Sequence, residues 1–283
     1  MTRVLFLLLP AVLLLSGCPS IRESRPLADA LRDGVHLERS LPKKIPDRAS
    51  KVPHSQYVLI RNESAVGLLV PVPFVADVVE NAANDHAAAA YEKKYGHVDP
   101  YRIVADAMNG SPVLAKGDAG LPLQPFAFLQ ECVDDRFRVT LVAHLESGET
   151  MGRYLIHLPG TYSPGEIADP PAEVLDRLAT ELRAAAIQLR ELVERGARNQ
   201  LRPSGVRADV GSLHLVGGRA VGLMPPSLLR AKDADLIEEG SDYIIVRIKG
   251  DVSLPASTGG LMFGVHRLRK DQLHTFEKHQ GTS

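Results

Sequence analysis

The feature that most constrains the fold is an alternation of apolar and polar residues between Phe126 and Leu158. Two short polar breaks, Asp134-Asp135 and Ser147-Gly148, divide this stretch into three segments. Successive side chains of a strand point to opposite faces of a sheet, so the alternation predicts strands with one buried face. If each break is a two-residue turn, the three segments form an antiparallel meander whose apolar face is covered.

These two turns also predict a register for the meander. They place Cys132 opposite Phe137 and Phe128 opposite Leu141 in the first hairpin, and Leu141 opposite Tyr154 in the second. The thiol of Cys132 would then be buried, which raises its pKa and makes it inert. The opposite face is expected to meet solvent, because it carries polar side chains, among them Arg138, Thr140, His144, Arg153 and His157.

The longest helix is expected to begin after Asp169-Pro170-Pro171 and to end near Arg195, before Gly196. Apolar residues recur along it with the spacing of three and four that marks one helix face. We expect this face to pack on the apolar face of the meander. A coiled coil with a partner chain is the alternative. The residues of the stripe are Leu175, Leu178, Leu182, Ala185, Leu189 and Leu192.

The rest of the chain predicts shorter elements and, with the meander and helix, an α+β fold. Residues 55–200 would form the main domain, and residues 201–283 a second small α+β part continuous with it. The expected strands are 56–60, 65–70, 243–248 and 261–268, with a hairpin over 213–223. The expected helices are an Ala-rich one ending at Tyr95, one from Asp99-Pro100 to Met108, and one over 227–236.

The N-terminus has the features of a signal peptide. A basic start is followed by an apolar run from Val4 to Leu15, shorter than the ~20 residues that span a bilayer. The run ends in Leu15-Ser16-Gly17-Cys18, which resembles the lipobox of bacterial lipoprotein precursors. The resemblance covers the first 18 residues. It implies removal of a signal peptide of residues 1–17 and acylation of Cys18, with fatty acids such as palmitate.

An acylated Cys18 would anchor the chain to a membrane of the cell envelope, facing the periplasm. The lipoprotein resemblance also associates aspartate at the next position with retention in the inner membrane. Here that position is Pro19, which favours the outer membrane. Residues 18–54 are polar and interrupted by prolines, so we expect a flexible tether. A coil of ~35 residues spans roughly 30 Å.

Composition excludes several classes of partner. The net charge of −1 argues against binding nucleic acid or an anionic lipid surface by charge. The chain has only two cysteines, so a lipidated Cys18 leaves Cys132 without a disulfide partner. Aromatic residues make up 5% of the chain and tryptophan is missing, which argues against a surface that stacks on sugars.

No catalytic motif stands out in the sequence, and no cofactor is indicated. A G-x-S-x-G elbow is lacking. His144 and Glu146 share a strand face and could contact one metal ion, although a solvated sheet face is the simpler interpretation. An enzyme would have to combine histidines such as His86, His97 or His144 with nearby carboxylates.

These observations favour a non-enzymatic envelope lipoprotein that acts as a structural or assembly component. Its partners would be the bilayer, through Cys18, and other envelope proteins. The expected contact surfaces are Pro71, Pro73 and Phe74 in one segment, and Gly259 and Gly260 in another. Two alternatives remain open. One is an anchored hydrolase, and the other is a carrier or sensor of a small or lipidic ligand held between the long helix and the sheet.

Overall fold

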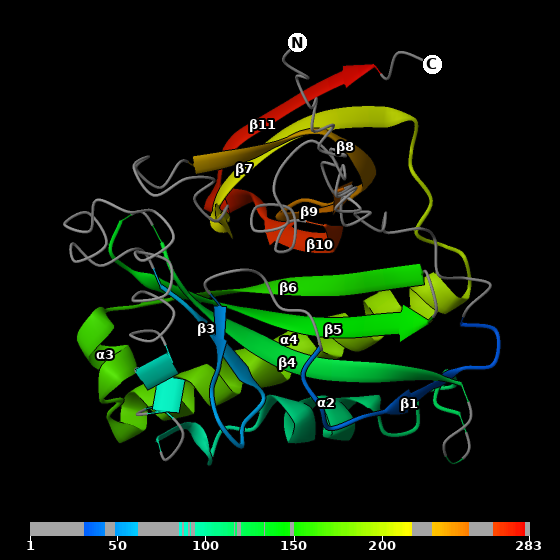
Figure 1. Ribbon diagram of the computed structural model, residues 1–283. Coiled ribbons are helices and arrows are strands. Elements are labelled where there is room, and N and C mark those ends of the chain that lie inside the picture. Colours follow the sequence, from blue (N-terminus) through cyan, green and yellow to red (C-terminus); the bar gives the residue numbers. More distant parts are fainter. Residues whose placement is uncertain are drawn as a thin grey trace, which may run out of the picture.

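A large mixed sheet dominates the computed structural model, as Figure 1 shows. The structure describes residues 31–42, 49–61, 85–86, 88–89, 91, 94–115, 117, 120–132, 134–147, 150–216, 228–248 and 263–280. The sheet has 11 strands in the order β11-β7-β8-β9-β10-β6-β5-β4-β3-β2, with β1 paired to β4 beside this path. Its strands are β1 (Val35–Leu37), β2 (Ala49–Lys51), β3 (Tyr57–Ile60), β4 (Leu121–Glu131), β5 (Phe137–Ser147), β6 (Thr150–Tyr162), β7 (Val206–Val216), β8 (Leu228–Glu239), β9 (Tyr243–Ile248), β10 (Gly264–Arg269) and β11 (Leu273–Gln280).

The α+β fold class predicted from the sequence is therefore wrong. The described part of residues 201–283 is a succession of strands with one short 3-10 helix, η2 (Lys270–Gln272), and not a small α+β unit. This part continues the same sheet, because β10 pairs in parallel with β6. The helix expected over 227–236 is instead β8, which is hydrogen-bonded to β7 on one side and β9 on the other. Such long-range pairing overrides a short apolar pattern that fits either structure.

The meander is confirmed as β4, β5 and β6, but the register of its first hairpin is wrong by one residue. Leu129 pairs with Val139, and Phe128 pairs with Thr140. The cause is the turn, in which the Cys132 amide donates to the Arg136 carbonyl at 2.8 Å. Three residues thus reverse the chain instead of two, and Asp135 adopts the left-handed φ of 55° that such turns need. A slip of one residue moves the even-numbered residues of β4 to the other face of the sheet.

The second hairpin keeps the predicted faces although its turn also lies elsewhere. Ser147 pairs with Thr150, and Leu141 pairs with Ile156 instead of Tyr154. This register differs by two residues, and a shift of two preserves which side chains share a face. The expected apolar face of these two strands is confirmed, and it belongs to the main core. Its members are Phe137, Val139, Leu141, Tyr154, Ile156 and Leu158.

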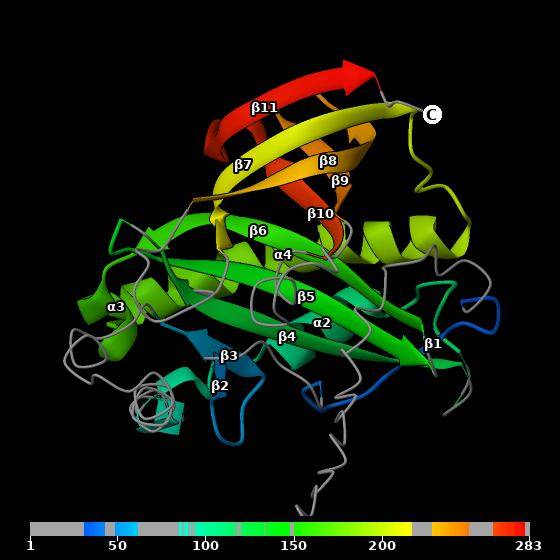
Figure 2. The same ribbon diagram turned by 45° about the horizontal axis from the view of Figure 1, so that its top comes forward.

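Helices cover that apolar face, on one side of the sheet (Figure 2). They are α2 (Pro100–Met108), α3 (Pro164–Ala168) and the long α4 (Ala172–Ala197), which confirms the predicted helix after Pro171. Asp99 caps α2 as expected, accepting from the Tyr101 amide at 3.0 Å. The stripe of α4 packs on β5 and β6, so it is used within the chain and not in a coiled coil. Its buried members include Leu178, Leu182, Ala185, Leu189 and Leu192.

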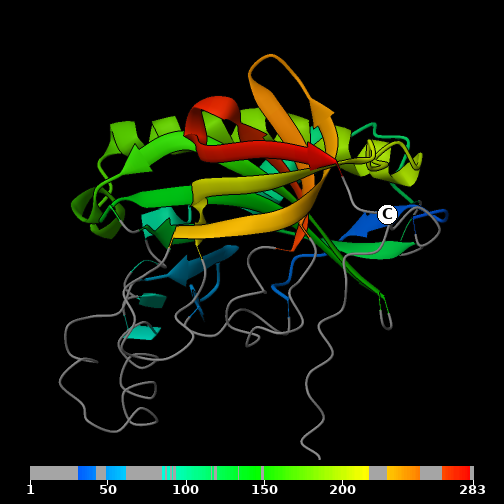
Figure 3. The ribbon, with the colours of Figure 1, turned by 90° about the horizontal axis from the view of Figure 1, so that it is seen from above.

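On the other side, the sheet curls upon itself. Figure 1 shows β7, β8, β9 and β11 beyond β6, and Figure 3 shows the same part from above with α4 running along one side. The curl encloses a second apolar core, which includes Val210, Leu236, Val246 and Leu268. We call the side of β4, β5, β6 and β10 that faces away from α4 the concave face. Phe126 and Phe128 lie on it because of the register of the first hairpin.

The structure tests only some of the predictions made for the N-terminal part of the chain. Within the segment expected to be a tether, β1 pairs with β4 and β2 pairs with β3, so these strands belong to the folded body. Residues 1–17, Cys18 and Pro19 lie outside the described residues, as do Pro71, Pro73, Phe74, Gly259 and Gly260. Among the helices that the structure describes, none is long and apolar enough to cross a bilayer.

Candidate functional site

Five polar side chains form a buried row on the concave face. They are Thr140 and His144 on β5, Arg153 and His157 on β6, and His266 on β10, and none is more than 4% exposed. We call them the polar row. The sequence predicted a solvated face at these positions of β5 and β6. The strands themselves are as expected, but this side of the sheet is also buried. Alternation within one segment carries no information on what the rest of the chain places over a face.

Three members of the polar row are linked by hydrogen bonds across three strands. The Thr140 hydroxyl lies 3.0 Å from Nδ1 of His157, and Nε2 of His157 lies 3.0 Å from Nδ1 of His266. The two rings are nearly coplanar, with 8° between their planes. A nitrogen–nitrogen hydrogen bond needs one donor and one acceptor, so this bond is lost if both rings are fully protonated. The chain of hydrogen bonds therefore joins β5, β6 and β10 as long as no more than one of the two histidine rings is positively charged.

Sequence reasoning identified His157 as a polar residue of the sheet and missed His266. The two histidines are 109 residues apart in the chain. They meet because β10 and β6 pair in parallel, with His266 opposite Leu155. Only a prediction of that long-range pairing could have brought them together.

The remaining members of the polar row, His144 and Arg153, contact each other. Nε of Arg153 donates to Nδ1 of His144 at 3.2 Å, and the guanidinium lies 4.3 Å from the ring centre of Phe263. Burial, with the charge of Arg153 second, lowers the pKa of His144 to about 3. Burial also lowers the pKa of Arg153 to about 10. A neutral histidine beside a buried cation is a structural pair, and its protonation is strongly opposed.

The proposed metal ligands His144 and Glu146 do lie close together, with Nε2 3.6 Å from the Glu146 carboxylate. However, the guanidinium of Arg153 occupies the same neighbourhood, and its positive charge would repel a cation. Within the described part of the chain, no group of three or more histidine, cysteine or carboxylate side chains comes together as a metal site would require.

The histidines considered for a hydrolase are not brought together. His86 and His97 are exposed, whereas His144 is buried on the concave face. The turn that carries His97 is fixed on the helix side of the sheet, because the Tyr57 hydroxyl donates to the Val98 carbonyl at 2.6 Å. His97 and His144 are thus associated with opposite faces of the sheet.

Cys132 is buried as predicted, and burial raises its pKa to about 11. Its neighbour is Arg138 and not Phe137, again because of the first register. Arg138 is itself held by Asp134 through two hydrogen bonds of 2.7 and 2.8 Å. This bond pair lowers the pKa of the Asp134 carboxyl.

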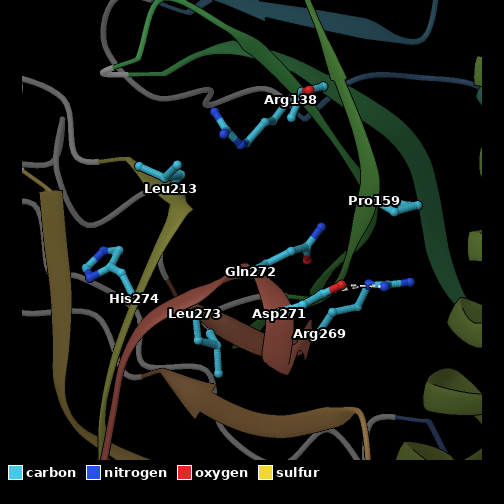
Figure 4. A pocket seen from close by; sticks show the side chains of 9 residues that line it. Arg138, Pro159, Leu213, Arg269, Asp271, Gln272, Leu273 and His274 are labelled. Atoms are coloured by element: carbon cyan, nitrogen blue, oxygen red, sulfur yellow. Dashed lines mark hydrogen bonds and ion pairs between the residues drawn. The ribbon is translucent and has the colours of Figure 1, made fainter.

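A cavity of about 370 Å³ opens where β5 and β6 face β7, η2 and β11, and Figure 4 shows its walls. It is lined by Arg138, Pro159, Thr161, Leu213, Arg269, Asp271, Gln272, Leu273 and His274. This is not the place where a ligand was expected from the sequence. Between α4 and the sheet, Leu178, Leu182 and Leu189 are at most 1% exposed and fill the interface.

Comparisons with protein-family models, with curated proteins and with solved structures find no match for this chain. Its function must therefore be inferred from the N-terminal motif and from the geometry of the concave face and its cavity.

Proposed function

We propose that the protein is a lipid-anchored component of the bacterial cell envelope that acts without catalysis, as a structural or assembly component in contact with other envelope proteins. The anchor is inferred from Leu15-Ser16-Gly17-Cys18, and Pro19 favours the outer membrane over the inner one. One observation supports the non-enzymatic role above the others. The side chains with acid–base or nucleophilic chemistry on the concave face are buried and bonded to one another.

A general acid, general base or nucleophile must come within hydrogen-bond reach of a substrate. His157 and His266 bond each other, His144 accepts from Arg153, and the thiol of Cys132 is enclosed beside Arg138. Each of these contacts joins neighbouring strands or closes a hairpin. Because buried polar groups must find partners, these contacts hold the strands in one register and one curl. This structural role explains the polar row without catalysis.

The end of the sheet offers a surface for a protein partner. Strand β11 is last in the strand order and pairs with β7 on one edge. A terminal strand presents backbone groups that can bind an extended segment of another chain. The exposed run from Glu277 to Gln280 makes this edge accessible. The segments containing Pro71–Phe74 and Gly259-Gly260 remain further proposed contact surfaces.

The anchor is tested by the change Cys18→Ser. We expect the variant to be released from the membrane fraction or mislocalised, and to remain folded, because the thioether that carries the lipid cannot form. Cell fractionation and the mass of the mature N-terminus measure this. The change Cys132→Ser is the matched control and should leave localisation unaltered. Normal processing and membrane retention of the Cys18→Ser protein would refute the anchor.

Contact with other envelope proteins is tested by crosslinking in intact cells. A photoreactive residue at Glu277 on β11 should give defined adducts with envelope proteins, identified by mass spectrometry. The same group at Asp176, on the exposed face of α4, is the control position. Absence of any protein adduct at β11, together with turnover of an envelope substrate by the purified protein, would contradict a non-enzymatic role.

A further inference from the structure

We propose that the cavity between β5, β6, β7, η2 and β11 is a binding site for a small organic acid with a short apolar group. This goes beyond the proposed role of the protein in assembly and does not depend on the lipid anchor. Three features of the cavity support the assignment: its size, its cationic donors and its apolar side chains.

The cavity lies between segments that are far apart in the chain. Thr161 and Pro159 come from β6, and Leu213 comes from β7. The opposite wall is formed by η2 and the start of β11, about 110 residues later in the chain (Figure 4). The Gln272 amide donates to the Leu158 carbonyl at 2.9 Å and fixes η2 against β6. A volume of about 370 Å³ lies within the range of small-molecule pockets, ~300–1,000 Å³.

Two guanidinium groups supply hydrogen-bond donors to the cavity. Arg138 donates two hydrogen bonds to the Asp134 carboxylate, one from each terminal nitrogen. Arg269 donates two to the Asp271 carboxylate, from Nε at 3.0 Å and from one terminal nitrogen at 2.5 Å. A guanidinium has five N–H donors, so each arginine retains donors for a ligand. Arg269 and Asp271 are two residues apart in the chain, and their ion pair is exposed to solvent, with 49% and 61% of the side chains accessible. A carboxylate can therefore approach Arg269 without breaking a buried ion pair, and Arg–carboxylate bonds are strong and directional.

Gln272 fixes one wall of the cavity. Its nitrogen faces the Leu158 carbonyl, which fixes the orientation of the amide, because a carbonyl can only accept. The amide oxygen is buried and has no hydrogen-bond partner among the described residues. Because this oxygen is enclosed by protein, a ligand in the cavity does not come within hydrogen-bond distance of it. Gln272 therefore shapes the cavity by holding η2 against β6 and offers no acceptor to the ligand.

The lining also includes apolar side chains. Leu213, Leu273 and Pro159 border the same space as Thr161 and His274. Figure 4 shows Leu213, Leu273 and Pro159 arranged around the Gln272 side chain. A ligand that matches these features has a carboxylate at one end and a short apolar group at the other. An N-acylated amino acid has this form, with its carboxylate for Arg269 and its side chain for the leucines.

The test uses the full chain and three probes in isothermal titration calorimetry. N-acetyl-L-leucine carries every required group, its amide N-acetyl-L-leucinamide lacks only the carboxylate, and inorganic phosphate carries charge without the rest. We expect saturable binding of one N-acetyl-L-leucine per chain. We expect at least tenfold weaker binding of the leucinamide and of phosphate.

Variants assign the binding to this cavity. Arg269→Gln should weaken binding of N-acetyl-L-leucine at least tenfold. The matched control is Arg39→Gln, since Arg39 has the same side-chain exposure of 49% and also pairs with an aspartate, Asp99, at 2.7 Å. It should change the affinity less than twofold. Thermal melts of all variants verify that each is folded.

Three results would overturn the proposal. One is no saturable binding of N-acetyl-L-leucine to the folded wild-type chain. Another is equal affinity for the leucinamide or for phosphate, which would remove the carboxylate or the organic part from the ligand. The third is an Arg269→Gln variant that binds as tightly as Arg39→Gln does. None of these results bears on whether Cys18 anchors the protein, so the two proposals fail independently.

Discussion

Replacing Leu182 by alanine should lower the free energy of unfolding by about 3–5 kcal/mol. Leu182 lies in the middle of α4, is fully buried and belongs to the core between that helix and the sheet. The change removes the apolar contacts of the side chain and leaves a space that close-packed neighbours fill only in part. Chemical denaturation followed by circular dichroism measures the loss.

The matched control lies on the same helix. Ile187 is similar in size, but 66% of it is exposed, so Ile187→Ala should alter stability by no more than about 0.5 kcal/mol. If both changes cost the same, the burial of the α4 stripe against β5 and β6 is wrong. If Leu182→Ala costs little and Ile187→Ala costs much, α4 packs through the opposite face, as it would against a partner chain.

This helix illustrates what the sequence could predict. Its boundaries and its buried face follow from proline near the start and leucine at helical spacing, which are local signals over many turns. The strands of the meander were also found, because alternation over 11 or more residues is a strong signal. For β5 and β6, even the buried face was correct, since their turn moved the register by an even number.

The register of the first hairpin and the curl of the sheet could not be predicted from the sequence, and particular residues show why. The first hairpin turns over three residues and not two, and one residue is enough to place Phe128 and Cys132 on the other face. The segment of β8 has few residues that distinguish a helix from a strand, and its pairing with β7 and β9 decides the matter. The parallel pairing of β10 with β6 joins His266 to His157 and so completes the polar row. No local pattern encodes it.

Acid should destabilise the protein through His144. In the folded chain its pKa is about 3, because burial and the adjacent Arg153 oppose protonation, against 6.5 for an ordinary histidine. Between these values the unfolded chain binds a proton at His144 that the folded chain does not. Stability is therefore complete above pH 6.5 and falls as the pH drops towards 3. The slope is about 1.4 kcal/mol per pH unit, or about 2 kcal/mol between pH 7.5 and pH 5.

The change His144→Gln isolates this contribution. Glutamine can accept the hydrogen bond that Nε of Arg153 donates to His144, but it does not titrate. The free energy of unfolding is measured by denaturation at pH 7.5, 6 and 5. Between pH 7.5 and pH 5 it should fall by about 2 kcal/mol less in His144→Gln than in the wild type. The control is His97→Gln, at an exposed histidine, which should keep the wild-type dependence on pH. The two variants each lack one histidine, and all titrating groups other than His144 and His97 cancel in the comparison. Equal pH profiles for the two variants would mean that His144 accepts a proton in the folded chain, and that the polar row is open to water and not buried.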